Sequence, residues 1–180
     1  MICASALLSC KKARLCKIAA SLLALLPATT FGNGAIDPAI TSTNFYETIC
    51  IPGYTKTVRP PVSVTNRIKK QMLRDTGIGE SHIREYELDH VIPLALGGHP
   101  SRLENLQLQL WEGHNGAKRK DRIEVKMQCL VCSGQVRLDQ AQREIANDWD
   151  AAYHRYASVK CNRVRNAPKF KPSGVGSGLF

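Results

Sequence analysis

Two segments near the middle of the chain alternate between apolar and polar residues, which is the pattern of a half-buried β-strand. The first segment covers residues 86–90, with Glu87 and Asp89 at its polar positions, and the second covers residues 106–110. The run Gly97-Gly98-His99-Pro100 between them carries turn signals. The alternation therefore predicts two short strands joined by a loop.

Apolar residues recur at helical spacing in three other segments. The first helix is expected to start at Ser63 or Thr65 as its N-cap and to end before Gly77. The second spans residues 117–130, and the third starts from an N-cap at Asp139. Their apolar stripes are Ile68, Met72 and Leu73, then Ile123, Met127 and Leu130, then Ala141, Ile145, Trp149 and Tyr153. Two strands followed by a helix, with helices before and after, predict an α+β fold.

The first 35 residues have the organisation of a secretory signal peptide. Four cations precede the nine apolar residues 18–26, and a small, polar run leads to cleavage near Ala28 or Ala35. Nine helical residues rise only ~14 Å, whereas a bilayer core is ~30 Å thick, so a membrane span is disfavoured. An uncleaved amphipathic N-terminus is the alternative. We expect an exported protein, periplasmic or secreted, without stable membrane association after cleavage.

The rest of the chain is long enough for one domain. Residues 36–62 contain turn signals at Asp37-Pro38 and Pro52-Gly53 and are expected to be irregular. Residues 63–160 hold all the predicted strands and helices. Residues 161–180, rich in proline and glycine, are expected to form a flexible tail.

Composition excludes a disordered chain and points to an anionic partner. Of the 180 residues, 43% are hydrophobic, and the net charge is +10. Without the four signal-peptide cations, 21 basic residues face 15 acidic ones, a net charge of +6. Nucleic acid and a membrane surface both fit such a charge. The basic outer face of the first helix is either solvated or a nucleic-acid contact: Arg67, Lys69, Lys70 and Arg74.

Four cysteines remain after removal of the signal peptide: Cys50, Cys129, Cys132 and Cys161. An even number of cysteines in an exported protein favours two disulfides. Half of a zinc site at Cys129 and Cys132 is the alternative, although Cys50 and Cys161 provide no second close pair.

Candidate chemistry concentrates at Asp89-His90, at the end of the first predicted strand. A carboxylate there can hold a hard cation while the neighbouring imidazole takes a proton from water, as metal-assisted hydrolysis requires. The pair alone also fits a surface acid beside a hydrogen-bonded histidine. Three further stretches add context: the double glycine, Glu104-Asn105-Leu106, and Asn115-Gly116-Ala117-Lys118 at the start of the helix.

Together these motifs resemble the HNH endonucleases over residues 84–126. The resemblance implies a ββα-metal finger in which His90 is the general base, Asp89 binds the divalent metal, and Asn105 ties the strands together. For the third position of the family motif, Asn115 fits best and His114 second, with Asp121 and Glu124 less favoured. In related variants, a metal-binding histidine aligns with Lys118, which cannot bind a cation.

The resemblance implies a metal-dependent endonuclease that uses Mg²⁺, Mn²⁺ or a similar ion on DNA or RNA. Lys118, Arg119 and Lys120 would then face phosphate at the helix N-terminus. Two other function classes stay open. One is a catalytically weak nucleic-acid-binding module, and the other is a disulfide-stapled periplasmic interaction protein.

Many family members hold the finger with zinc-binding cysteine pairs that flank it, and this chain has no such pairs. We therefore expect disulfides to constrain the domain. Cys129 and Cys132 share one helical turn, so each can reach a different distant partner. We predict bridges from Cys50 to Cys132 and from Cys129 to Cys161, with a vicinal Cys129–Cys132 bridge as the alternative.

Overall fold

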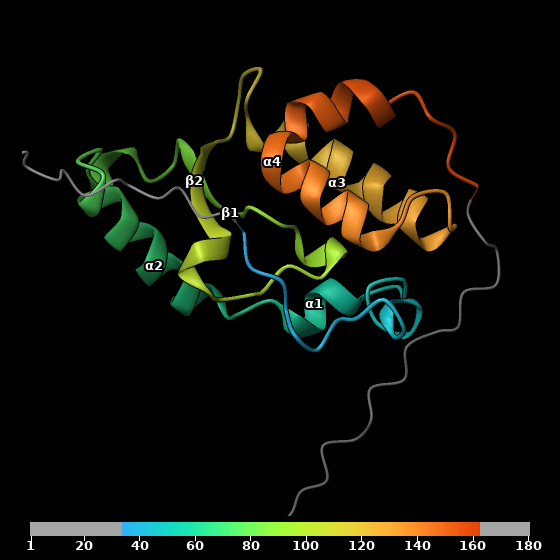
Figure 1. The fold of residues 1–180 in the computed structure, drawn as a ribbon. Helices are drawn as coiled ribbons and strands as arrows, with labels where there is room; N and C mark the ends of the chain where they lie inside the picture. Colours follow the sequence, from blue (N-terminus) through green and yellow to red (C-terminus); the bar gives the residue numbers. More distant parts are fainter. Residues whose placement is uncertain (1–33, 163–180) are drawn as a thin grey trace, which may run out of the picture.

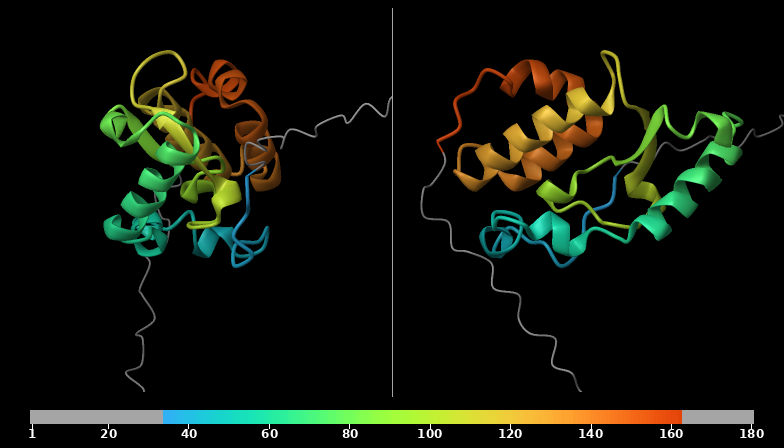
Figure 2. Two further views of the ribbon diagram at one scale, coloured as in Figure 1. Left: turned by 90° about the vertical axis from the view of Figure 1, so that its left-hand side faces the viewer. Right: turned by 180° about the vertical axis from the view of Figure 1, so that it is seen from behind.

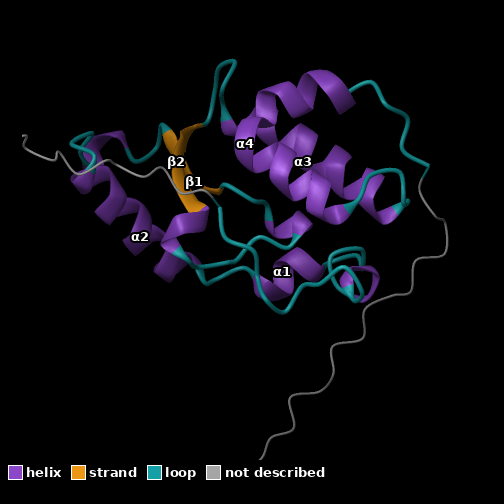
Figure 3. Ribbon diagram, in the orientation of Figure 1, coloured by secondary structure: helices purple, strands orange, loops and turns teal. Residues whose placement is uncertain are grey.

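Two antiparallel strands lie between two groups of helices (Figure 1). In the computed structural model, which describes residues 34–162, β1 spans Tyr86–His90 and β2 spans Leu106–Leu110. Their register pairs Asp89 with Gln107 and His90 with Leu106. Figure 3 shows this hairpin as the sheet of an otherwise helical arrangement. The mixed α+β class predicted from the alternation is confirmed.

The helix α2, Val62–Asp75, packs against the hairpin on the side away from α3 and α4 (Figure 2). Leu73 is its fully buried residue. The helix begins earlier than predicted, at Val62, because Pro61 already supplies the extended N-cap backbone. No side-chain cap is present, so the proposed capping roles of Ser63 and Thr65 are wrong.

The main hydrophobic core lies between α3, Ala117–Cys132, and α4, Leu138–Tyr156, which run side by side. The predicted apolar stripe of α3 is confirmed, since Ile123, Met127 and Leu130 are at most 1% exposed. The short 3-10 helix Leu94–Leu96, in the connection between the strands, adds Leu96 to this core. The loop that follows Asp89-His90 is thereby anchored to the helical pair.

The helix α4 is interrupted at Asp148, whose backbone is non-helical (φ −162°, ψ 89°). The Asp148 carboxylate accepts a hydrogen bond from the Ala151 amide at 2.9 Å, so the residue caps the restarted helix. The predicted stripe holds at Ala141 and Ile145, and then the buried face moves to Ala152 and Tyr156.

The start of α4 also differs from its prediction. Arg137, with extended backbone, occupies the N-cap position, and the carboxylate of Asp139 pairs with Arg137 and Arg143 instead of capping the helix. A side chain that already holds two guanidinium groups at the surface is not free to bind the first amides.

The segment before α2 is less irregular than predicted. It contains a 3-10 turn at Phe45–Glu47 and the short helix α1, Tyr54–Val58. The amide of Gly34 donates to the carbonyl of Glu104, and Ala35 accepts from the amide of His99. The backbone of Gly34 and Ala35 thus belongs to the folded domain, whereas the rest of the predicted signal peptide lies outside the described residues.

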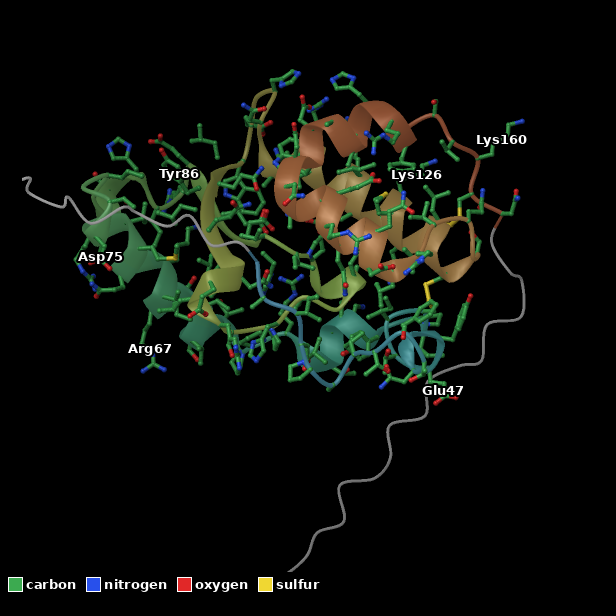
Figure 4. The ribbon with its side chains drawn as sticks, in the orientation of Figure 1. Glu47, Arg67, Asp75, Tyr86, Lys126 and Lys160 are labelled. Atoms are coloured by element: carbon green, nitrogen blue, oxygen red, sulfur yellow. A yellow bond between two sulfur atoms is a disulfide. The ribbon has the colours of Figure 1, made fainter. Side chains whose placement is uncertain are left out.

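Two disulfides tie both ends of the described chain to one turn of α3. Cys50 is bonded to Cys132 and Cys129 to Cys161, which is the predicted pairing, over sequence separations of 82 and 32 residues (yellow bonds in Figure 4). In the chain-entropy model, each bridge contributes roughly 4 kcal/mol. Both the vicinal bridge and a zinc site at Cys129 and Cys132 are wrong. Disulfides are compatible with an exported protein.

Cys161 lies in the folded domain, so the predicted tail boundary moves beyond it, and residues 163–180 lie outside the described part. Among the helices of residues 34–162, none combines the length and the apolar character that a bilayer crossing requires.

Candidate functional site

Asn105 organises the loop between the strands from a fully buried position. Its side-chain oxygen accepts the amide of Ile92 at 2.8 Å, and its nitrogen donates to the carbonyls of Ile92 at 3.0 Å and His99 at 2.9 Å. The oxygen also accepts the amide of Ala35 at 3.3 Å. These bonds satisfy the buried amide group of Asn105 and fix the path of the loop on both sides. Asn105 therefore acts by positioning other residues.

The double glycine in this loop has a steric cause. A Cβ on Gly98 would lie 1.7 Å from the carbonyl oxygen of Ile92 and 2.8 Å from the side-chain nitrogen of Asn105. At Gly97, where φ is 77°, a Cβ would lie 2.7 Å from Ile40. The loop can close around the Asn105 side chain because neither residue has a side chain of its own.

His90, at the end of β1, is 7% exposed, and the loop holds its ring. The Nε2 atom lies 3.1 Å from the carbonyl oxygen of Pro100. A carbonyl can only accept, so Nε2 carries the proton and Nδ1 has the free lone pair. Nδ1 has no hydrogen-bond partner among the described residues. Burial lowers the pKa of His90, against the opposing effect of the Pro100 hydrogen bond, so the neutral ring is favoured.

Asp89, next to His90, contacts an internal ammonium group. Its Oδ1 accepts the His90 amide at 2.8 Å, and its Oδ2 lies 2.8 Å from Nζ of Lys120 on α3. The same Nζ donates to the carbonyl of His90 at 2.7 Å and pairs with Glu124 one helical turn further on. Burial alone would lower the pKa of Lys120, but Glu124 and Asp89 raise it, so the amine stays charged.

Two further carboxylates are electrostatic neighbours of Asp89: Glu87, which shares the polar face of β1 with it, and Asp121 on α3. Burial raises the pKa of Glu87 to about 7, and the charges of Asp89, Asp121 and Glu124 add to that rise. Burial also raises the pKa of Glu124 to about 7 and, together with Asp89, that of Asp121. The polar face of β1 therefore meets α3 with more carboxylates than nearby cations.

The chemistry of these oxygen ligands suits a hard divalent cation, although the described structure does not bring three of the carboxylates together into one ligand group. Carboxylate oxygens are the ligands that Mg²⁺ and Mn²⁺ prefer, and an additional positive charge would relieve the repulsion among the acids. One oxygen of Glu87, Oε2, is buried without a hydrogen-bond partner. Asp89 and Glu87 are accordingly the residues that would hold such an ion. The Lys120 ammonium on Oδ2 of Asp89 competes with it.

The three cations expected to face phosphate have three different environments. Lys118 is largely exposed and pairs with Glu112. Arg119 is 12% exposed, pairs with Asp150 and lies over the Tyr153 ring at 4.0 Å. Lys120 is 1% exposed, so it cannot face phosphate in this structure, and its place in that group is corrected. A long side chain pointing inward between carboxylates is not recognisable from sequence spacing.

Of the two expected third metal ligands, His114 lies beside α4, and Asn115 contacts His114 and accepts a hydrogen bond from the Gln109 side chain at its backbone carbonyl. The His114 Nδ1 and the Asn115 side-chain oxygen are 3.1 Å apart. His114 forms a group with Asp150 and His154, whose ligand atoms all lie within 4.8 Å of one another. No described contact joins either side chain to Asp89.

Sequence reasoning missed Glu87, the Pro100 carbonyl, and the pair Asp150 and His154. The signal for Glu87 was available, because residues two apart on a strand share a face. The one-turn spacing of Asp150 and His154 was also visible. Their proximity to His114 depends on the interruption of α4 at Asp148 and on the course of the 111–116 loop.

No family model, no curated protein and no solved structure matches this chain.

Proposed function

We propose that this chain is a metal-dependent endonuclease with a ββα finger of the HNH type. The observation that carries the proposal is the environment of His90. Its Nε2–H is held by the Pro100 carbonyl and its Nδ1 is left unprotonated, while the backbone amide of the same residue donates to the Asp89 carboxylate. A neutral imidazole with one anchored nitrogen is the arrangement that a general base requires.

In the proposed reaction, Nδ1 of His90 accepts a proton from the water that attacks the scissile phosphate. The bond from phosphorus to the 3′ oxygen breaks, and this oxygen takes a proton from solvent water, so the products are a 3′-hydroxyl and a 5′-phosphate. The Pro100 carbonyl stabilises the resulting imidazolium through its hydrogen bond to Nε2. Asp89, with Glu87, would hold a divalent cation, which supplies positive charge at the phosphate as the pentacovalent transition state forms. Asn105 keeps the His90 ring and the Pro100 carbonyl in their relative positions, because it fixes the loop between these two residues.

DNA is the proposed substrate, because the surface offers several positive side chains to a phosphate backbone. Lys118 is exposed at the start of α3. A shallow surface groove along α2 is lined by Arg67, Lys70 and Arg74, of which Lys70 and Arg74 share the carboxylate of Glu80, and Figure 4 shows Arg67 extending away from the body. Contacts of this kind depend on salt and carry little sequence information, which favours cleavage of broad specificity.

A second candidate function is nucleic-acid binding without efficient cleavage. The contact between the Lys120 ammonium and Asp89 favours it, because this ammonium already neutralises the expected metal ligand. The presence of Lys118 where related sequences are expected to have a ligating histidine points the same way.

Plasmid cleavage by the purified, disulfide-bonded protein separates the two functions. With Mg²⁺ or Mn²⁺, a nuclease nicks and linearises the plasmid, and excess chelator stops the reaction. Asp89→Asn should raise the metal concentration needed for half-maximal activity, whereas Asp139→Asn, at an exposed site on α4, should leave it unchanged. If the protein binds DNA in a salt-dependent way but does not cleave it at any metal concentration, the binding module is supported. If it neither binds nor cleaves DNA, both proposed functions are contradicted.

A further inference from the structure

The geometry points to a second metal site, formed by His114, Asp150 and His154 and selective for a borderline transition-metal ion such as Zn²⁺. One ligand atom from each of these side chains lies within 4.8 Å of the other two, and of the described residues these three form the group that can hold an ion in this way. The inference does not depend on the nuclease proposal.

The interruption of α4 is what brings the ligands together. Because Asp148 ends one helical segment and caps the next, the last turns take a new direction. Asp150 and His154 lie one turn apart on that restarted segment, with the Asp150 Oδ2 atom 3.7 Å from Nε2 of His154. His114 reaches the pair from the loop before α3, and the two imidazole ring centres are 6.5 Å apart.

All three ligands have contacts outside the group. Nη2 of Arg119 lies 3.5 Å from Nε2 of His154, and a metal ion bound at this nitrogen has to displace that contact. The side-chain oxygen of Asn115 accepts the Nδ1–H of His114, which leaves Nε2 as the free donor atom for a metal. Arg119 donates to Oδ1 of Asp150, and Oδ2 is the oxygen directed at His154. Metal ligands in proteins are commonly supported by such hydrogen bonds.

Arg119 is itself held in place, so its position is not that of a free surface cation. It lies over the Tyr153 ring at 4.0 Å and donates to the carbonyl of His114 at 3.1 Å. The loop, α3 and α4 are thus already joined through one guanidinium group. A bound ion would add a second connection between the loop and α4.

The chemistry of the three ligands determines which metal ions the site prefers. Two imidazoles and one carboxylate suit Zn²⁺, Co²⁺, Ni²⁺ or Cu²⁺, whereas Mg²⁺ prefers oxygen ligands. Three protein ligands with a fourth position for water would complete a tetrahedral zinc site. The cluster at Glu87 and Asp89 has the opposite chemistry, so the two sites should differ in the metal they take.

The test measures Zn²⁺ and Co²⁺ binding to the untagged, disulfide-bonded full chain, with free thiols alkylated and excess Mg²⁺ present. All titrations use a His90→Ala background, which removes the histidine of the proposed nuclease site. We expect one Zn²⁺ per chain by calorimetry and a visible Co²⁺ absorption typical of tetrahedral coordination. His114→Ala and His154→Ala should each weaken binding about tenfold or more.

His82→Ala is the matched control, because His82 is also exposed and lies beside a single carboxylate, Glu85, at 2.8 Å. It should leave the zinc affinity unchanged. The inference is overturned if His114→Ala and His154→Ala bind Zn²⁺ as tightly as the control does, or if Mg²⁺ displaces the zinc. Loss of plasmid cleavage would not affect this result, since binding is measured without His90.

Discussion

The buried ammonium group of Lys120 is expected to stabilise the folded protein. This group lies between the carboxylates of Asp89 and Glu124. Lys120→Met should leave two buried carboxylates without their cation and lower the free energy of unfolding by about 3–5 kcal/mol. Urea unfolding in chelator measures the change. Lys118→Met, at an exposed position on the same helix, should cost less than about 0.5 kcal/mol, and equal effects of the two substitutions would refute the internal role of Lys120.

His90 is expected to act in the chemical step alone. His90→Ala should reduce metal-dependent plasmid cleavage by roughly 10²–10⁴-fold, because the water loses its proton acceptor. DNA affinity at fixed salt should stay within about twofold, since no phosphate contact is removed. Cleavage rates and gel shifts, measured beside the exposed control His82→Ala, separate the two effects. A rate within about tenfold of the unsubstituted protein would remove His90 from this role.

Glu87 makes stability depend on pH. Its pKa rises from 4.5 to about 7 in the folded protein, so between these values the folded state retains a proton that the unfolded state has released. Stability from this group therefore falls as the pH rises through that window. In chelator, Glu87→Gln should gain stability relative to the unsubstituted protein between pH 5 and pH 8, measured by urea midpoints. The exposed control Glu85→Gln should show no such gain, and a gain of equal size there would contradict the prediction.

At the scale of elements, the loop between β1 and β2 depends on one amide side chain. Asn105→Asp keeps the oxygen that accepts from Ile92 but loses the nitrogen that donates to the carbonyls of Ile92 and His99. We expect a loss of about 2–4 kcal/mol in unfolding free energy. Mn²⁺ affinity, measured by titration calorimetry at a temperature where the variant stays folded, should change less than it does in Asp89→Asn. The opposite ranking would make Asn105 a metal ligand.

The elements that were predicted correctly are those whose structure follows from the pattern of neighbouring residues in the sequence. Alternation at residues 86–90 and 106–110 located both strands, since one face of the hairpin is covered by α2 and the other is polar. The interruption of α4 was missed because Asp148 lies inside an otherwise regular helical pattern. An aspartate forms a cap only where the backbone leaves the helical conformation, and the residue pattern around Asp148 does not show that departure.

At the scale of the whole molecule, contacts between distant segments decide the details of the site. The spacing of Asp89 and His90 identified the centre of the candidate site. Spacing could not show that Lys120, 30 residues after His90, donates to the His90 carbonyl. Nor could it assign His114 to a group with Asp150 and His154. Each of these contacts crosses between elements whose relative positions are set by the core.

The disulfide from Cys50 to Cys132 encloses α1, α2, the hairpin and the whole of α3 in one covalent ring. The exposed loop at Gly113 and His114 lies inside that ring. A protease that cuts there should produce two peptides that migrate as one species without reductant and separate with it. Electrophoresis under both conditions measures this, and separation without reductant would show that the ring is open. The molecule should therefore withstand a broken backbone at this exposed loop, which is an advantage wherever proteases share its compartment.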